Sequence, residues 1–237
     1  MIESLIGSDN LALSILQLAQ RLIIVLIALT VHEVAHGWVA LKLGDDTAAK
    51  FGRLSLNPIK HLDPWGFVSM LLFGFGWANP VPIRAGRFKN PRRGMALSAL
   101  AGPCANLILA VFGWLILEAV IFFVPDAVYY AYAGYTQITS DISFAVNMLE
   151  VTTSFLWMFT YLNVSLAVFN FLPIPPLDGS RVLYAFLPDK LYFGIMKYER
   201  VISIVIMVLL LTGLLDYPLS WLVGTIMNGI AFIIPII

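Results

Sequence analysis

Residues 21–42 read RLIIVLIALTVHEVAHGWVALK, an apolar run that is bounded by Arg21 and Lys42 and contains two histidines and a glutamate. As a helix with a rise of 1.5 Å per residue, the run measures about 31 Å, close to the thickness of a bilayer's hydrocarbon core. It therefore predicts a membrane span over about residues 22–41, with residues 11–20 either continuing the helix or lying on the surface. Ionisable groups inside such a span cost free energy, so their presence needs a chemical reason.

The composition extends this prediction to the whole chain. Of 237 residues, 60% are hydrophobic and 12% are charged, whereas a typical soluble domain has about 25% charged residues. Asp216-Tyr217-Pro218 is predicted to form the turn between the last two of four further spans, because proline starts a helix well and continues one badly. These spans are expected at about residues 94–124, 148–171, 200–215 and 217–236. The sequence thus predicts a mainly α, polytopic membrane protein with about five to six transmembrane helices in a single domain, residues 1–237.

Basic residues indicate how the spans are oriented. They gather between the first and second spans and between the third and fourth: Lys42, Lys50, Arg53, Lys60, Arg84, Arg87, Lys89, Arg92, Arg93, Arg181, Lys190, Lys197 and Arg200. Residues 125–147 contain no lysine or arginine. Because cytoplasmic loops are enriched in basic residues, we expect a cell-membrane protein with its N-terminus outside and its C-terminus inside. Its partner is then the lipid bilayer, and a formal net charge of zero gives no argument for nucleic acid.

The region between the first two spans contains a shorter apolar segment. Residues 65–79, WGFVSMLLFGFGWAN, are interrupted by glycines and too short to cross comfortably, which predicts a re-entrant or interfacial segment. Residues 53–56 and 80–84 alternate apolar and polar side chains beside prolines that exclude helix. A small membrane-associated β-hairpin or sheet is therefore expected at the cytoplasmic face. His61 lies in this region and is interpreted as an ordinary loop histidine, because no partner motif accompanies it.

The polar residues of the first span form a recognisable pattern. His32 and His36 stand four residues apart, so on a helix both imidazoles project from one face and can bind one metal ion, while Glu33 can reach a bound water. This is the H-E-x-x-H arrangement of zinc hydrolases. A chance occurrence is the alternative, but polar groups at this depth need a compensating partner, and a metal ion is the most economical one. By helical rise from Lys42, His36 lies about 9 Å and His32 about 15 Å from the predicted cytoplasmic end.

A catalytic zinc ion takes three protein ligands and leaves one position for water, so a third ligand must come from elsewhere in the chain. His61 is one candidate. Asp178 is the better one, because the prolines of FNFLPIPPLDGSRVL stop the third span just before it and leave it on non-helical backbone. Asp178 could instead be the N-cap of a helix that begins at residue 179 or 180, since aspartate is a good capping residue. The cap alone does not explain the prolines, which favours ligation.

Two asparagines are further candidates. Asn106 follows Gly102-Pro103 in the second span, about 20 Å from Arg93 by helical rise and therefore at the depth of His32. At that depth it can hydrogen-bond a substrate carbonyl or its oxyanion, although small residues and a proline in a span often serve only helix packing. Asn170 precedes the prolines and either binds substrate or satisfies carbonyls that the prolines free.

Three motifs together resemble the site-2 protease family of intramembrane zinc metalloproteases: HEVAH at 32–36, GPCAN at 102–106 and NFLPIPPLDG at 170–179. The resemblance covers nearly the whole chain and is closest to compact prokaryotic members without a PDZ or CBS domain. It implies one Zn²⁺ per chain bound by His32, His36 and Asp178. It also implies that Glu33 is the catalytic base and that Asn106 contacts the substrate or transition state.

The predicted function is hydrolysis of peptide bonds in or near transmembrane segments by zinc-activated water, with a transmembrane protein as substrate. A membrane metal transporter is disfavoured, because the path from His32 outward to Arg21 is almost wholly apolar. A catalytically inactive membrane scaffold is the other alternative, and it would not require Glu33. The sequence leaves open whether the chain forms a homodimer.

Overall fold

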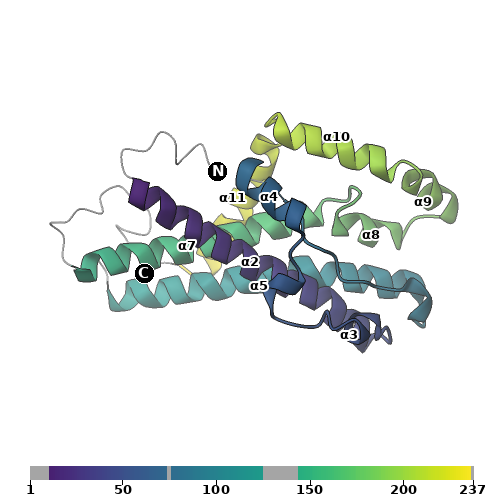
Figure 1. Ribbon diagram of the computed structural model, residues 1–237, viewed down its shortest axis with the longest axis horizontal. Helices are drawn as coiled ribbons and strands as arrows, with labels where there is room; N and C mark the ends of the chain where they lie inside the picture. The colour runs from purple at the N-terminus through teal and green to yellow at the C-terminus, as the bar shows by residue number, and fades with distance from the viewer. Residues whose placement is uncertain (1–10, 74–75, 125–143, 236–237) are drawn as a thin grey trace.

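The computed structural model describes residues 11–73, 76–124 and 144–235. Within these ranges the chain is almost entirely helical (Figure 1). The elements, in chain order, are α2 Leu11–Lys42, α3 Thr47–Lys50, η1 Pro58–Lys60, α4 Pro64–Phe73, η2 Ala85–Arg87, α5 Pro91–Phe123, α7 Phe144–Phe171, α8 Asp178–Tyr184, α9 Asp189–Met196, α10 Glu199–Leu211 and α11 Asp216–Ile233.

Three long helices form the body of the molecule, and α5 packs against both α2 and α7. Each is long and apolar enough to cross a membrane. Residues 11–20 continue α2 rather than forming a separate element. Helix α5 begins at Pro91, where the Asn90 side chain caps the helix by accepting a hydrogen bond from the Arg93 backbone N–H at 3.2 Å.

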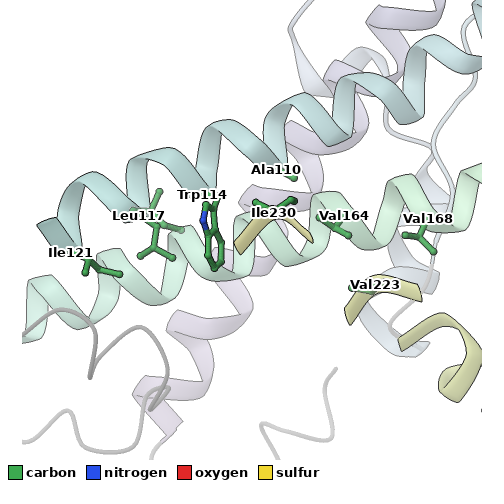
Figure 2. Packing of buried hydrophobic residues seen from close by; sticks show 9 residues of the cluster. Ala110, Trp114, Leu117, Ile121, Val164, Val168, Val223 and Ile230 are labelled. Carbon is green, nitrogen blue, oxygen red and sulfur yellow. The ribbon is translucent and has the colours of Figure 1, made fainter. Parts of the chain in front are cut away.

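A buried apolar cluster joins α5, α7 and α11 (Figure 2). Trp114 and Leu117 of α5 belong to it together with Val164 of α7, and α11 adds Ile230. Gly113 lets the two long helices approach closely, because a methyl group there would lie 2.7 Å from the Phe159 ring. The core therefore fixes how α5 and α7 lie relative to one another.

The prediction of five to six spans is wrong for the described residues, which contain three candidate spans, or four if α10 and α11 are counted as one broken span. The two helices meet at an angle of 84°. The 13 residues of α10 measure about 20 Å, too short to cross 30 Å of hydrocarbon. The turn between them lies at residues 212–215, around Gly213 with its φ of 72°, and Asp216-Tyr217-Pro218 is instead the first turn of α11.

The predicted β-hairpin or sheet is also wrong for the part of the chain that the structure describes, where a single isolated bridge joins Leu62 and Ala78. Residues 53–56 and 80–84 are not paired as strands, because side chains engage their backbone groups instead. Arg53 donates to the carbonyls of Asn79 and Pro80, at 2.5 and 3.3 Å.

The described residues on either side of α4 meet, because Leu62 and Ala78 form an isolated antiparallel bridge. Beside it the Asn79 N–H donates to the His61 carbonyl at 2.8 Å. That this segment is re-entrant or interfacial stays a prediction.

The two basic regions lie at one end of the bundle, with α3 and the first turn of α5 beside α8 and α9 (Figure 1). Which side of the membrane they face stays a prediction.

Candidate active site

Helix α2 supplies the first part of the site. His32 and His36 are buried, with 4% and 7% of their surface exposed, and their ring centroids are 4.5 Å apart with the planes perpendicular. The spacing of four residues places both rings on the face of α2 that packs against α5. The Nε2 atoms of the two rings approach to 3.0 Å.

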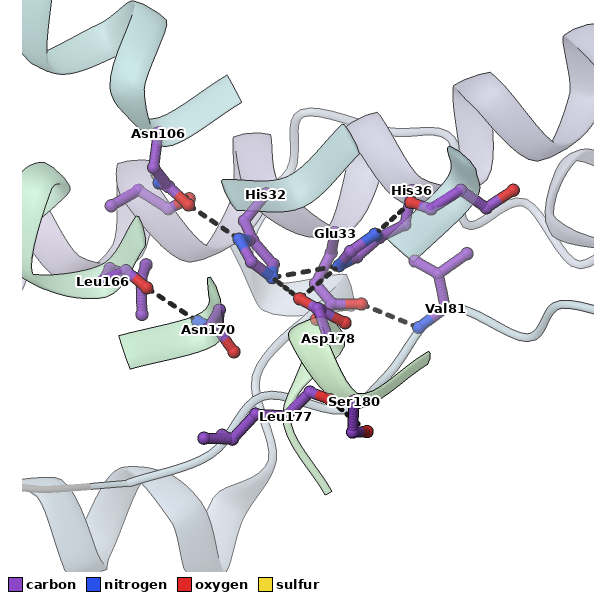
Figure 3. Close-up of polar contacts among 12 residues, drawn as sticks. His32, Glu33, His36, Val81, Asn106, Leu166, Asn170, Leu177, Asp178 and Ser180 are labelled. Atoms are coloured by element: carbon purple, nitrogen blue, oxygen red, sulfur yellow. Dashed lines mark hydrogen bonds and ion pairs between the residues drawn. The ribbon is translucent and has the colours of Figure 1, made fainter. Parts of the chain in front are cut away.

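Asp178 completes a group of three potential metal ligands, and the described residues contain no other such group of three or more His, Cys, Asp or Glu. Its Oδ2 atom lies 3.1 Å from His32 Nε2 and 3.2 Å from His36 Nε2 (Figure 3). The prolines after α7 end that helix at Phe171, so the chain turns back into α8, which begins at Asp178. The N-cap of α8 is Leu177, with no side-chain cap bond, so the carboxylate of Asp178 faces the histidines rather than capping a helix.

The hydrogen bonds behind the two rings determine where their protons lie. His36 Nδ1 lies 2.7 Å from the Ser98 carbonyl, which can only accept, so Nδ1 carries the proton. His32 Nδ1 lies 2.6 Å from Asn106 Oδ1. The Asn106 amide is oriented by its Nδ2, which donates to the carbonyl of Ala28 at 3.2 Å and to Asn163 Oδ1 at 3.0 Å. In the neutral form, each ring therefore turns the lone pair of its Nε2 atom toward Asp178 Oδ2.

Three potential ligand atoms thus converge on one point. Their separations of 3.0 to 3.2 Å are close to the roughly 3.3 Å expected between neighbouring ligands of a tetrahedral zinc ion with bonds of about 2.0 Å. In a buried setting these atoms need a positive charge among them, which a metal ion supplies by displacing any proton on Nε2. The donor set and its geometry therefore fit a divalent metal ion, and two imidazoles with one carboxylate suit zinc.

Gly102 allows α5 to approach this group. A methyl group at this position would lie 2.5 Å from His36 Nε2 and 2.6 Å from His32 Cε1. The glycine of the GPCAN motif is thus required because the α5 backbone passes directly against both rings.

Glu33 lies beside the three ligands and is buried. Its Oε2 accepts a hydrogen bond of 2.8 Å from the Val81 backbone N–H (Figure 3). Arg53 holds the carbonyls of Asn79 and Pro80, immediately before Val81. The extended segment 79–84 therefore fixes the orientation of the carboxylate.

Asn106 lies where its depth predicted, beside His32, and is fully buried. Its oxygen and both amide hydrogens are engaged by protein groups, so contact with a substrate oxyanion would require one of these bonds to open. That contact remains a prediction, and the observed role of Asn106 is to orient the His32 ring.

Asn170 and His61 do not join the group of ligands. Asn170 donates to the Leu166 carbonyl at 2.9 Å, one turn back in α7, which is not a carbonyl freed by the prolines. Its predicted contact with substrate stays a prediction. His61 is buried and bonds through Nε2 to the Ser55 carbonyl at 2.8 Å, in agreement with its interpretation as a loop histidine.

Some functional contacts were not predicted from the sequence. The contact of Asn163 could have been predicted, because an amide in an apolar helix needs a polar partner, and this one is fully buried. Ser98 and Val81 act through backbone atoms, so their side chains give no signal of the contact.

The family model for peptidase family M50 matches residues 20–215. The chain belongs to peptidase family M50. This confirms the resemblance to site-2 proteases and, at the level of the family, the prediction of an H-E-x-x-H metallopeptidase.

One relative of this family M50 member is a protein of Bacillus subtilis (strain 168) named "Putative zinc metalloprotease YwhC". The two are 40% identical over 205 residues, which cover 86% of each chain. The similarly named Rip2 of Mycolicibacterium smegmatis is 29% identical over 196 residues, 81% of this chain and 66% of the relative. Rip3 of Mycobacterium tuberculosis (strain H37Rv) is 28% identical over 207 residues, 85% of this chain and 40% of the relative. No solved structure shows a significant match to the chain.

Proposed function

We propose that this chain is an intramembrane zinc metalloprotease that hydrolyses peptide bonds in or near transmembrane segments of other membrane proteins. The observation that carries the proposal is the convergence of three potential ligand atoms, from His32, His36 and Asp178, beside a buried glutamate on an apolar helix. The family and the names of the relatives support it.

One zinc ion per chain would be held by His32 Nε2, His36 Nε2 and Asp178 Oδ2. When bound, zinc would supply a strong Lewis acid and an activated water at neutral pH. Asn106 and the Ser98 carbonyl hold the two imidazoles in the tautomer that leaves Nε2 free for ligation. This support ties the site to α5 as well as to α2 and α8.

Glu33 acts as general base and then as general acid. Its carboxylate takes a proton from the attacking water and passes it to the leaving amine as the peptide bond breaks. The hydrogen bond from Val81 holds the carboxylate in place during both transfers.

We further propose that the protein lies in the plasma membrane with the N-terminal end of α2 outside and the site nearer the cytosol. The basic regions at one end of the bundle support this orientation. Water would then reach the site from the cytosol, past the loop before Asp178, without crossing the outer leaflet.

Purified wild-type protein and Glu33→Gln test the proposal when both are measured for bound zinc and for cleavage of a transmembrane substrate whose helix contains destabilising residues. We expect similar zinc content in both proteins and cleavage by the wild type alone. Equal cleavage by both would refute the role of Glu33. Bound zinc with no cleavage of any substrate would favour a scaffold, and zinc flux into liposomes would favour a transporter.

A further inference from the structure

Gly37 follows Glu33 by four residues on α2, so both lie on the same side of the helix. The position is buried. A methyl group there would lie 2.7 Å from Leu54 Cδ2 and 3.0 Å from both Ala48 Cβ and Val81 Cγ1. None of these three atoms belongs to a metal ligand. The lack of a side chain at Gly37 therefore lets the chain that follows α2 lie directly on the helical turn that carries Glu33.

Val81 contacts α2 at two points that are one helical turn apart. Its backbone N–H donates to Glu33 Oε2 at 2.8 Å (Figure 3), and its Cγ1 atom lies against the open position at Gly37. The valine is 7% exposed. A displacement of its side chain away from Gly37 therefore also moves the N–H group that Glu33 binds.

The backbone around Val81 is too stiff to absorb such a displacement locally. Pro80 and Pro82 flank Val81, and each proline fixes its own φ and restricts the residue before it to extended conformations. Three residues further on, the Arg84 N–H donates to the buried Asp45 at 2.6 Å. The side chain and the N–H of Val81 are therefore expected to move together.

We propose that Gly37 is a positioning residue for the general base Glu33 and acts through Val81, an inference that rests on the proposed function. Leu54 can turn its Cδ2 atom aside by a change of rotamer. Carbon atoms in contact lie about 3.5 to 4.0 Å apart, so a methyl group at Gly37 displaces Val81 by about 0.5 to 1 Å. The hydrogen bond to Glu33 then exceeds the usual limit of about 3.2 Å. A misplacement of about 1 Å in a catalytic group costs about 100-fold in rate.

The test measures kcat, KM and zinc affinity for wild type, Gly37→Ala, Val81→Ala and the double variant on one transmembrane substrate. We expect Gly37→Ala to lower kcat at least about tenfold and to change KM less than about twofold, because a misplaced base slows the chemical step alone. Zinc affinity should stay within about threefold of wild type, since the ligands are not displaced. Expressing kcat per bound zinc ion removes the effect of unfolded protein.

The double variant isolates the contact with Val81. Val81→Ala keeps the backbone N–H and removes Cγ1, so in this background Gly37→Ala should lower kcat less than about threefold. Ala48→Gly is the matched control, because it removes the other carbon atom at 3.0 Å. In the Ala48→Gly background, Gly37→Ala should still lower kcat at least about tenfold.

Hydrogen exchange reports the same contact without any substrate. Pro80 and Pro82 have no amide hydrogen, so the Val81 N–H is the single exchangeable backbone group of residues 80–82. We expect it to exchange at least about tenfold faster in Gly37→Ala than in wild type. The double variant should exchange at residue 81 as slowly as Val81→Ala does.

The outcomes separate the two proposals. If the wild type cleaves no transmembrane substrate, the proposed function and the positioning role are both overturned. If the wild type is active but Gly37→Ala keeps its kcat, keeps the exchange rate of Val81, or binds zinc more weakly, the protease stands and the positioning role is overturned. A Gly37→Ala effect that persists in the Val81→Ala background also overturns it, and Gly37 then serves only the packing of α2.

Discussion

The replacement Gly102→Ala tests how the metal site is assembled between helices. The added methyl group would lie 2.5 Å from His36 Cε1 and Nε2 and 2.6 Å from His32 Cε1. Carbon atoms in contact lie about 3.5 to 4.0 Å apart, so α5 and the rings must separate by about 1 Å. Overpacking of this kind costs about 1 to 3 kcal/mol of stability.

The larger effect falls on zinc binding. The ligand atoms are 3.0 to 3.2 Å apart, and metal sites tolerate deviations of only about 0.2 Å in bond length. A displacement of about 1 Å therefore removes at least one imidazole from ligation. Loss of an outer-shell partner alone weakens metal binding about 10- to 100-fold, so we expect Gly102→Ala to weaken it by at least about 100-fold.

Zinc affinity, measured by chelator competition on the purified protein, and thermal unfolding together check this expectation. Gly113→Ala is the matched control, because its methyl group would lie 2.7 Å from the Phe159 ring, away from the ligands. It should lower the unfolding temperature and keep zinc affinity. Gly224→Ala, with no atom within 4 Å of the added methyl, should change neither. If Gly102→Ala binds zinc as tightly as Gly113→Ala, the close approach of α5 to the rings is wrong.

Three further replacements probe the site and its support. Asn106→Leu should weaken zinc binding about 10- to 100-fold in the same chelator assay, because His32 Nδ1 loses its acceptor; unchanged affinity would refute this role. Asp178→Asn keeps the side-chain shape but replaces a charged ligand with a neutral one. The zinc content of this variant should therefore be lower than that of Asn106→Leu. An equal or higher zinc content would count against ligation by Asp178. Asp45 is fully buried in the loop after α2; burial alone would raise its pKa, but the hydrogen bonds from Arg84 N–H and from Thr47 outweigh burial and hold that pKa below its ordinary value. A carboxyl with a lowered folded-state pKa stabilises the fold above its unfolded-state pKa and stops doing so as pH falls through the folded value. Asp45→Asn should therefore lower the free energy of unfolding by about 1 to 3 kcal/mol at neutral pH. In unfolding experiments this difference from wild type should shrink below about pH 4. A difference that does not depend on pH would contradict the charge argument.

The sequence by itself determined the parts of this protein that depend on one helix at a time. Apolar runs between charged residues located the long helices, since the length needed to cross hydrocarbon is fixed by helical rise. A spacing of four residues placed His32 and His36 on one face. Equal depth in two spans placed Asn106 beside His32, and the prolines before Asp178 indicated why the chain turns back toward the histidines.

Only the tertiary structure decided which atoms meet across elements. The proton positions on the two imidazoles depend on a backbone carbonyl at Ser98 and on the amide of Asn106, and a backbone group has no side-chain identity for a sequence pattern to reveal. The same holds for the Val81 N–H that fixes Glu33. The predicted strands failed because side chains satisfied their backbone groups. The extra spans failed because α10 has only 13 residues and ends at the turn around Gly213. The loss of the strands depends on contacts between distant segments, which local periodicity does not record.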